Sequence, residues 1–522
     1  MDQHTGSGAR QGPPADPIAA TGSDRSEGAS GQGGERPRER ARARVAANDE
    51  RPIDRRTGRA DDRPGVGSQS AEASPSPTRS RSTEPGARGV EALTERLRAV
   101  RERTLAIAAP LSAEDCQPQS MPEASPIKWH LAHTTWFFDT FLLAPRGAAV
   151  APHWSEVFNS YYVGVGPRHD RPRRGLLTRP SLDAVLAYRR EVEERVAHLI
   201  PRATEAELER LELGLNHEQQ HQELALMDLL HLLSNNPLDP VYLERARPGD
   251  GSTERSTDAP PPSGAIEVDA GLFEIGRAAD DSRFAYDNEA PRHRVFVEAF
   301  ALATRPVSCA EYRAFVEDDG YRRPELWMSD GWDAIEREGW TAPLYWRRAA
   351  DGGWSRFGLD GAHPLEDAEP VQHLSWYEAD AYARWLAERV PGARLPREHE
   401  WEVAVRRGFD AWTSDADEDP RRVGSPDDQR APIRTRPRAM TNARVEPGDG
   451  WEWTASDYAA YPGFRPAAGA VGEYNGKFMS GQLVLRGASF ATPPGHSRPT
   501  YRNFFWHTAR WPFTQLRLAF DG

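Results

Sequence analysis

The first 88 residues contain no Leu, Phe, Tyr or Trp, and the first Leu of the chain is Leu93. Gly, Pro, Ser, Arg, Asp and Glu dominate this segment. Such a composition cannot bury enough apolar surface to offset the conformational entropy lost on folding. We therefore predict a disordered tail over residues 1–88, and we expect the folded part of the chain to follow it. The basic run RPRERARAR could contact an anionic partner, although a solvated tail is the simpler interpretation.

Residues 89–243 carry a helical pattern. Apolar residues recur with helical spacing, Ser-Pro and Ser precede two of the stretches, and Thr204 with Glu207 forms a capping box at another. Four helices of this length favour an all-α four-helix bundle, with a long aromatic and basic loop between the second and third helices. The predicted helices cover residues 89–111, 125–145, 181–200 and 204–236.

After a predicted linker at residues 244–263, the pattern changes to short strands, many turns and many Trp residues. This change predicts an α+β domain over residues 264–522. Strands are expected within 264–276, 293–308 and 484–491, and short helices within 308–320 and 375–390.

The charge and cysteine content narrow the class of protein. The chain has 66 Lys and Arg against 79 Asp and Glu, a net charge of −13, which gives no reason to expect nucleic-acid binding. Cys116 and Cys309 are the only cysteines, too few for a disulfide framework. We find neither a signal peptide nor an apolar run of the ~20 residues that cross a bilayer. These features predict a reduced, cytoplasmic protein without a membrane partner.

The fourth predicted helix contains His217 and His221, four residues apart in an HExxH pattern. This spacing places both imidazoles on one helix face, where they can share a metal ion, although paired histidines are often ordinary surface or core residues. A zinc protease of the metzincin type would have Gly in place of Leu224 and His in place of Met227. Glu244, the other candidate third ligand, begins the linker. A zinc protease is therefore a remote alternative.

A better source of a third ligand is WHLAHTTWFF on the second predicted helix, which contains His130 and His133. Facing helices of a bundle can bring ligands together in the core. Three neutral histidines leave a divalent ion with its full charge and open positions, an arrangement that suits Fe(II) binding a thiolate and O2. Spacing alone allows either histidine to be the ligand, with the other packed behind it.

The chain contains a set of distinctive motifs: SPIKWHLAHTTWFF, FNSYYVGVGPRH, LNHEQQHQEL, LSWYEADAYARW, ARLPREHEWE, GWEWTASDYAAYPGF, YNGKFM and RPTYRNFF. Together these motifs resemble those of the hercynine oxygenases, the iron-dependent sulfoxide synthases of ergothioneine biosynthesis. The resemblance covers about residues 90–522, and it implies a DinB-like bundle followed by an α+β domain of the formylglycine-generating-enzyme and C-type-lectin-like type. It also implies that Fe(II) is held by His133, His217 and His221. It gives Glu218 no role and makes Glu223 a supporting acid.

The family reaction joins a thiol to C2 of the imidazole ring of hercynine (trimethylhistidine) and oxidises the sulfur, using O2. It needs a proton donor that prevents simple oxidation of the thiol, and tyrosine suits this role. The resemblance places Tyr161 and Tyr162 at the site as catalytic residues, although paired tyrosines in a loop are more often packing residues.

The resemblance also implies substrate-binding residues. Gln220 matches the family residue that hydrogen-bonds the hercynine imidazole. Arg168 and Arg171 match an RxxR pair that binds the carboxylate of the thiol substrate, a task that suits guanidinium groups.

The C-terminal YRNFF motif departs from the branch of the family that uses γ-glutamylcysteine. That branch has Asn, Trp and Asp here, with an Arg four residues after the Asp, whereas this chain has Asn503, Phe504, Phe505 and then Ala509. The carboxylate expected for the glutamyl group is missing. Asn503 can still contact hercynine, and the aromatic faces can hold its trimethylammonium group by cation–π attraction. We therefore favour cysteine as the thiol, with γ-glutamylcysteine as the alternative.

Other interpretations share the three histidines. An ovothiol-type enzyme would take histidine, a selenoneine synthase would take a selenium donor, and a non-catalytic protein would use the bundle as a metal-binding scaffold. An active formylglycine-generating enzyme needs two cysteines for copper, and the second domain has only Cys309. Calcium is known in such folds, but nothing in the sequence specifies it, and the sequence does not give the oligomeric state.

Overall fold

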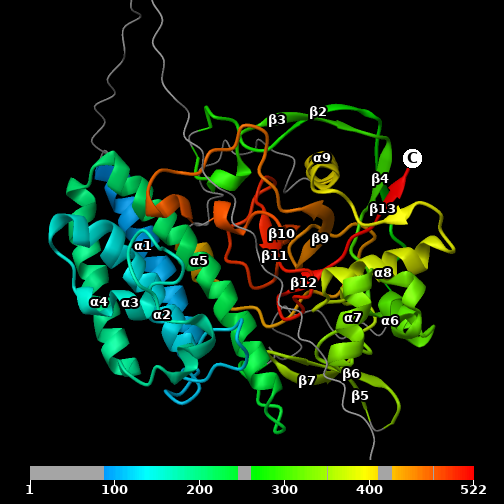
Figure 1. The fold of residues 1–522 in the computed structure, drawn as a ribbon, viewed down its shortest axis with the longest axis horizontal. Helices are drawn as coiled ribbons and strands as arrows, with labels where there is room; N and C mark the ends of the chain where they lie inside the picture. The colour runs from blue at the N-terminus through cyan, green and yellow to red at the C-terminus, as the bar shows by residue number, and fades with distance from the viewer. Residues whose placement is uncertain (1–86, 245–259, 282, 350, 410–425, 474) are drawn as a thin grey trace, which may run out of the picture. The chain divides into compact units, whose positions relative to one another are not determined.

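The structure is a computed structural model that describes residues 87–522 apart from 245–259, 282, 350, 410–425 and 474 (Figure 1). The predicted tail, except for its last two residues, and most of the predicted linker lie outside the described residues. The domain boundaries derived from them therefore stay predictions.

The N-terminal part of the described chain is helical. Three of its four long helices match the predicted stretches within three residues at each end, whereas α2 ends at Phe138, seven residues before the predicted end at 145. Helix α2 packs against α4 and α5, and α1 packs against α5 (Figure 1). The predicted caps are present: the Ser181 side chain accepts a hydrogen bond from the backbone N–H of Ala184, and the Glu207 carboxylate accepts one from that of Thr204 at 2.7 Å. The long helices are α1 (Ala87–Ala108), α2 (Ile127–Phe138), α4 (Leu182–Leu199) and α5 (Glu205–Ser234).

Helix α2 is the central element of this part, because all 12 of its residues are buried. A helix that is apolar on all sides is stable only when other elements surround it. It continues into a π-helical turn (Asp139–Leu143) and a 3-10 turn (Ala144–Arg146), and the segment ends at Gly147, whose φ of 68° lies in the left-handed region. The histidines of α2 are therefore held in a fixed, largely dry environment.

The long loop that runs from Gly147 to α4 contains three short helical segments and is fixed by side-chain hydrogen bonds to its backbone. Asn159 donates to the carbonyl of Tyr162 at 3.0 Å and accepts from its N–H at 3.1 Å. Glu473, from the C-terminal part, accepts from the N–H groups of Val163 and Gly164 at 3.0 and 2.8 Å. The paired tyrosines thus lie on a backbone held from both sides. The helical segments are the 3-10 helix Pro152–Trp154, α3 (Ser155–Phe158) and the 3-10 helix Arg171–Leu176.

The C-terminal part is α+β, and each predicted strand and helix region contains elements of the expected type. The described strands form four sheets with the orders β1-β4-β13-β8, β11-β10-β9-β12, β2-β3 and β5-β6-β7, in which β9 and β12 are parallel. The strands are β1 (Ala265–Val268), β2 (Gly271–Ile275), β3 (His293–Val297), β4 (Phe300–Ala303), β5 (Trp346–Arg348), β6 (Trp354–Gly358), β7 (Gly361–Pro364), β8 (Ala393–Arg394), β9 (Gly450–Asp457), β10 (Leu483–Ala488), β11 (Asn503–Phe505), β12 (Thr514–Gln515) and β13 (Ala519–Asp521). The helices are α6 (Cys309–Glu317), α7 (Ser329–Glu338), α8 (Trp376–Ala387), α9 (Glu398–Gly408) and α11 (Pro426–Gln429).

Helix α5 is joined to the C-terminal part through the buried carboxylate of Glu223. This carboxylate accepts hydrogen bonds from Trp451 Nε1 at 2.6 Å and from the hydroxyls of Ser489 and Thr492, both at 2.7 Å. Burial raises the pKa of Glu223, while the three donors favour its ionised form. Because Glu223, Trp451 and His221 border one cavity, this connection places the sheet containing β9 and β10 next to the histidines.

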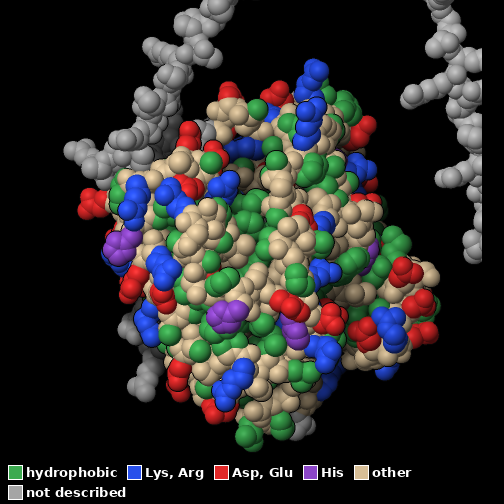
Figure 2. Space-filling view, turned by 60° about the vertical axis from the view of Figure 1, so that its left-hand side comes forward, with side chains coloured by type: hydrophobic (Ala, Val, Ile, Leu, Met, Phe, Trp, Pro, Cys, Tyr) green, Lys and Arg blue, Asp and Glu red, His purple; other side chains and the backbone are tan. Residues whose placement is uncertain are grey.

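Acidic and basic side chains are interspersed over the face shown in Figure 2, so on this face the negative net charge is spread out rather than gathered in one area. None of the helices in the described residues combines the length and apolarity of a membrane-spanning segment.

Candidate active site

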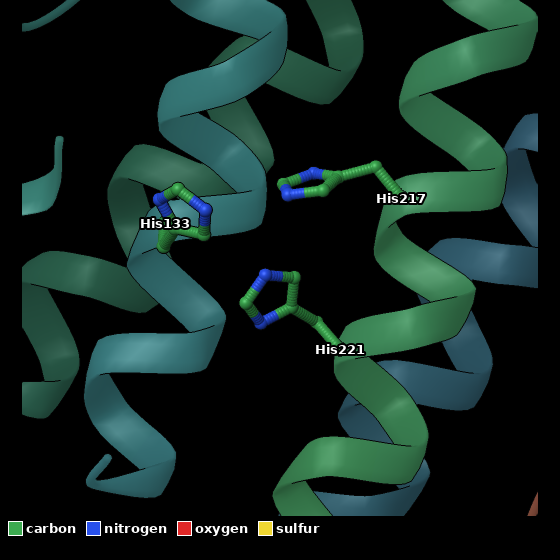
Figure 3. Close-up of side chains that lie close together, drawn as sticks. All are labelled: His133, His217 and His221. Atoms are coloured by element: carbon green, nitrogen blue, oxygen red, sulfur yellow. The ribbon is translucent and has the colours of Figure 1, made fainter. Parts of the chain in front are cut away.

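His133, His217 and His221 face one another across the space between α2 and α5 (Figure 3). One ring nitrogen from each lies within 4.8 Å of the others, so a single metal ion can contact all three. The ring centroids of His133 are 5.0 Å from those of His217 and 4.7 Å from those of His221. His217 and His221 come together because they are one helical turn apart, and His133 joins them through the packing of α2 on α5.

The hydrogen bonding of His133 leaves one nitrogen available to a metal. Its Nδ1 donates to the carbonyl of Phe158 at 2.6 Å, so the lone pair is on Nε2. Nε2 is buried and has no hydrogen-bond partner among the described residues. Trp129 stacks on the ring at 4.5 Å between centroids and fixes its plane. A buried, unsatisfied nitrogen of this kind is what a metal ligand requires.

His221 is oriented by a second histidine and a carboxylate. His130 Nδ1 lies 2.9 Å from His221 Nδ1, and His130 Nε2 lies 3.1 Å from Asp228 Oδ2, which also accepts from the backbone N–H of Ser125. With His130 donating to Asp228, its Nδ1 accepts from His221 and leaves His221 Nε2 free for a metal. His130 thus lies behind the three-histidine cluster. The sequence analysis missed Asp228, although it lies two helical turns after His221 on the same face.

The electrostatics of the cluster keep the three imidazoles neutral. Burial lowers the pKa of His217 to about 4, and it lowers the pKa values of His133 and His221 well below their usual range. A neutral imidazole can donate its lone pair to a metal, whereas an imidazolium cannot. The orphaned nitrogen, the fixed tautomers and the neutral donor set therefore fit a divalent metal ion.

Glu218, which would be the general base of an HExxH protease, does not belong to this cluster. Its carboxylate accepts hydrogen bonds from Arg101 and Arg189, both at 2.9 Å, and from Thr104 at 2.7 Å. Burial opposes its ionisation, but the two guanidinium groups dominate and lower the pKa of Glu218 to about 2. A carboxylate committed to two buried arginines has no basic electron pair to offer a water molecule, which disfavours the protease interpretation.

A cavity of about 260 Å³, called here the substrate cavity, borders His221 and lies between the helices and the C-terminal part. Its wall includes Tyr161, Arg171, Gln220, Asn503, Phe504 and Phe505, so it brings together most of the predicted substrate-binding residues. Tyr162 and Arg168 are not in its wall.

The arginines of the cavity differ from the predicted pair. Arg168 is exposed and outside the wall, whereas Arg171 and Arg174 are both part of it. Arg174 is buried, lies 3.4 Å above the Trp129 ring, and donates to the hydroxyls of Ser125 and Ser160. Burial lowers its pKa, and it forms no ion pair with any described residue. The sequence analysis missed Arg174, although Arg171 and Arg174 have the same RxxR spacing as Arg168 and Arg171.

The two tyrosines border different spaces. Tyr161 lies in the wall of the substrate cavity, whereas Tyr162 is 2% exposed and borders a second cavity together with His217. Burial raises the pKa of Tyr162 well above its usual value, partly offset by a hydrogen bond with Tyr161. Their ring centroids are 4.6 Å apart. Tyr162 therefore stays protonated, and each tyrosine of the pair shares a cavity wall with a histidine of the cluster.

The polar and aromatic groups opposite the histidines come largely from β11. Asn503 begins this strand, and Phe504 stacks on Tyr458 at 4.1 Å between centroids. Gln220 donates to the hydroxyl of Tyr501 at 2.7 Å, a contact that the sequence analysis did not foresee. Ala509, where the γ-glutamylcysteine branch has Arg, is buried and lies outside the cavity wall.

Comparisons with known proteins agree with this architecture. Residues 96–233 match the DinB superfamily, and residues 252–521 match the sulfatase-modifying factor enzyme 1-like domain. The hercynine oxygenase of Mycolicibacterium smegmatis is 32% identical over 454 residues, which cover 83% of this chain and 99% of the relative. The chain belongs to the hercynine oxygenase family. The hercynine oxygenase of Mycobacterium tuberculosis is also 32% identical, over 455 residues, with the same coverage of both chains. The family predicted from the motifs is thus confirmed, and with it the prediction that the protein is an oxygenase.

The C-terminal part has a separate similarity to the formylglycine-generating enzyme of Bos taurus, which is 31% identical over 160 residues, 28% of this chain and 41% of the relative. Cys309 is buried at the start of α6 and is not in the wall of the substrate cavity. Burial raises the pKa of its thiol well above the usual value, which disfavours a reactive thiolate. This part of a hercynine oxygenase family member instead supplies β11 and its neighbours to the cavity.

Proposed function

We propose that this protein is an Fe(II)- and O2-dependent sulfoxide synthase that joins cysteine to C2 of the hercynine imidazole. The observation that carries the proposal is a single cavity in which His221 of the three-histidine cluster, Tyr161, Arg174 and Asn503 all come together. In this proposal, α1, α2, α4 and α5 act as a four-helix bundle of the DinB type that presents His133, His217 and His221 to the metal.

The overall stoichiometry defines what the protein must do. Hercynine, a thiol and O2 give a sulfoxide and water: one C–H and one S–H bond are lost, a C–S and an S=O bond form, and O2 is reduced by four electrons. Bound Fe(II) would supply the redox chemistry and gather the thiolate and O2. The competing oxidation to cysteine sulfinate places both oxygen atoms on sulfur and needs no net proton delivery. A proton donor beside the metal therefore favours the sulfoxide.

The chain's own residues would bind and orient the substrates. Arg174 would bind the cysteine carboxylate, because a buried guanidinium without a carboxylate partner is stabilised by an incoming anion. Arg171, which is more exposed, would assist it. Asn503 and Gln220 would hydrogen-bond hercynine, and Phe504 and Phe505 would face its trimethylammonium group. A thiol substrate must stay reduced until it reacts, so we also propose a cytoplasmic setting; both cysteines of the chain are free thiols.

Replacing Arg174 with Gln should raise the KM for cysteine about 10- to 100-fold, since a hydrogen bond to a charged group contributes roughly 1.5–3 kcal/mol. The KM for hercynine should change much less. Arg168→Gln is the matched control, because Arg168 is exposed and outside the cavity wall; its kinetics should stay close to wild type. Steady-state kinetics with each substrate varied in turn would measure both effects, and an equal effect of the two variants would contradict this role for Arg174.

Phenylalanine at Tyr161 should divert turnover from the sulfoxide to cysteine sulfinate, because the hydroxyl next to the histidine cluster would be lost. Tyr162→Phe should have the same direction of effect through the hydrogen bond between the two tyrosines. Tyr242→Phe is a suitable control, since its hydroxyl bonds the carbonyl of Ile107 outside both cavities. Quantifying both products by mass spectrometry gives the ratio; unchanged ratios in both variants would remove the tyrosines from the mechanism.

The direct test offers the protein Fe(II), O2 and hercynine with cysteine and γ-glutamylcysteine as competing thiols. We expect hercynyl-cysteine sulfoxide as the main product, because the wall of the substrate cavity has Phe505 where the other branch has a carboxylate. A glutamyl product alone would keep the enzyme class and contradict the choice of thiol. No sulfoxide from either thiol would favour histidine or a selenium donor as substrate, or a non-catalytic metal-binding role, and these would be tested next.

A further inference from the structure

A second cavity, of about 510 Å³, reaches the histidine cluster from the side of His217. It follows one face of α5: Ala206, Glu209 and Arg210 are exposed, Leu213 is half-buried and His217 is buried, and all of them border the cavity. Apart from the adjacent pair Glu209 and Arg210, successive positions are three or four residues apart, so they line one side of the helix in order of increasing depth. The cavity thus leads from the protein surface to a residue of the cluster.

Near the cluster the wall of this second cavity is aromatic and apolar: the ring of Phe137 lies 4.8 Å from that of His217 between centroids, and Tyr162 and Leu213 also line the cavity. Several of its charged groups are already engaged with neighbours. Glu212 pairs with Arg96 at 3.0 Å, and Asp287 accepts from Asn475 at 2.6 Å. Glu209 and Arg210 lie at the exposed end, so beside His217 a charged amino acid would find few partners, whereas a small apolar molecule needs none.

The substrate cavity has limited room. Its volume of about 260 Å³ is below the ~300–1,000 Å³ of ordinary ligand pockets, and in the proposed reaction two amino-acid-sized molecules must occupy it together. With both present, O2 would have to pass between tightly packed substrates to reach the cluster. The second cavity borders His217 and Tyr162, whereas the substrate cavity borders His221 and Tyr161.

We propose that the second cavity is the route by which O2 reaches the metal while hercynine and cysteine fill the substrate cavity. This inference rests on the proposed function, which identifies the gas as O2 and the two organic substrates as hercynine and cysteine. Leu213 lines this route one helical turn before His217 on the same face of α5, so a larger side chain at this position would narrow the route next to the cluster. Separate routes would allow both organic substrates to bind first without excluding O2.

Two measurements that do not depend on turnover test this route. Crystals of the wild-type protein under xenon pressure should show xenon beside Leu213, because apolar cavities bind xenon, and Leu213→Trp should remove it. Nitric oxide binding to the Fe(II) protein can be followed by stopped-flow absorbance. With both substrates bound, Leu213→Trp should slow this binding at least ~10-fold, and without substrates much less, since the substrate cavity is then open.

Leu224→Trp is the matched control, since Leu224 lies on the same helix but borders the substrate cavity. It should raise the KM for the organic substrates and leave nitric oxide binding to the substrate-free protein close to wild type. If Leu213→Trp does not fold, Val471→Phe takes its place, because Val471 lines the second cavity from the C-terminal part rather than from α5. An unchanged nitric oxide rate in the narrowed variant with substrates bound, or no xenon in the wild-type cavity, overturns the route. Absence of sulfoxide from the wild-type protein would instead contradict the proposed function.

Discussion

Alanine at His133, His217 or His221 should each abolish the binding of iron to the protein. The reason is geometric: the three ring nitrogens lie within 4.8 Å of one another, and among the described residues the histidines are the only group of three or more His, Cys, Asp or Glu side chains so arranged. Two imidazoles alone leave the ion mostly hydrated and bound weakly. Metal content after anaerobic reconstitution with Fe(II) and desalting, measured by inductively coupled plasma mass spectrometry, gives the result directly.

Two further histidines make this prediction specific. His130→Ala should weaken iron binding roughly 10- to 100-fold rather than abolish it, because His130 orients His221 without contacting the metal. His231→Ala should not change iron binding. His231 lies ten residues after His221 on α5, and its Nδ1 hydrogen-bonds the Ser120 hydroxyl rather than facing the cluster. Wild-type iron content in any of the three alanine variants would show that the cluster is not the iron site. Loss of iron in His231→Ala would point to a general folding defect.

The second large effect concerns stability rather than metal. Replacing Glu218 with Gln should lower the free energy of unfolding of the helical part by about 3–5 kcal/mol, because the variant leaves the buried Arg189 guanidinium without its carboxylate partner and leaves Arg101 with only the longer contact to Glu193. Arg101 and Arg189 are 1% exposed each, so water cannot replace the carboxylate. For a part of this size the loss corresponds to a decrease in Tm of roughly 10 °C, measurable by calorimetry of the metal-free protein.

Glu193→Gln is the matched control, because Glu193 also contacts Arg101. Glu193 lies 3.5 Å from Arg101 and its side chain is 30% exposed, so its removal should cost less than about 1 kcal/mol.

The contribution of Glu218 to the free energy of unfolding should depend on pH in a defined direction. Since the pKa of Glu218 falls from 4.5 to about 2 on folding, its contribution is complete above about pH 4.5 and is lost as the pH decreases toward 2. A Glu218→Gln variant as stable as wild type would contradict the buried ion-pair network.

Local sequence signals predicted the secondary structure well where the determinants are local. The Ser181 cap and the Thr204–Glu207 capping box mark the starts of α4 and α5, because these contacts span only three residues. Residues 125–145 were predicted as one helix, whereas the structure changes from the α-helix α2 to a π-helical turn at Asp139. This change accompanies the burial of α2 on every side, which depends on tertiary packing.

The site was predictable only in part. The pair His217 and His221 follows from helical periodicity, but the choice between His133 and His130 depends on which face of α2 meets α5. Arg168, Arg171 and Arg174 share one spacing, so spacing could not identify which two of them border the cavity. The second cavity has no sequence signature, since it arises where α5 passes residues more than 250 positions later in the chain, such as Ala467.

The Glu223 connection has a consequence for recombining these enzymes. Its three donors come from two separate segments of the C-terminal part, and all three bonds form beside a histidine of the metal cluster. The helical and sheet-containing parts are therefore not interchangeable modules. A chimaera with the C-terminal part of another relative should retain a working site only if the donors at Trp451, Ser489 and Thr492 are kept together with Glu223.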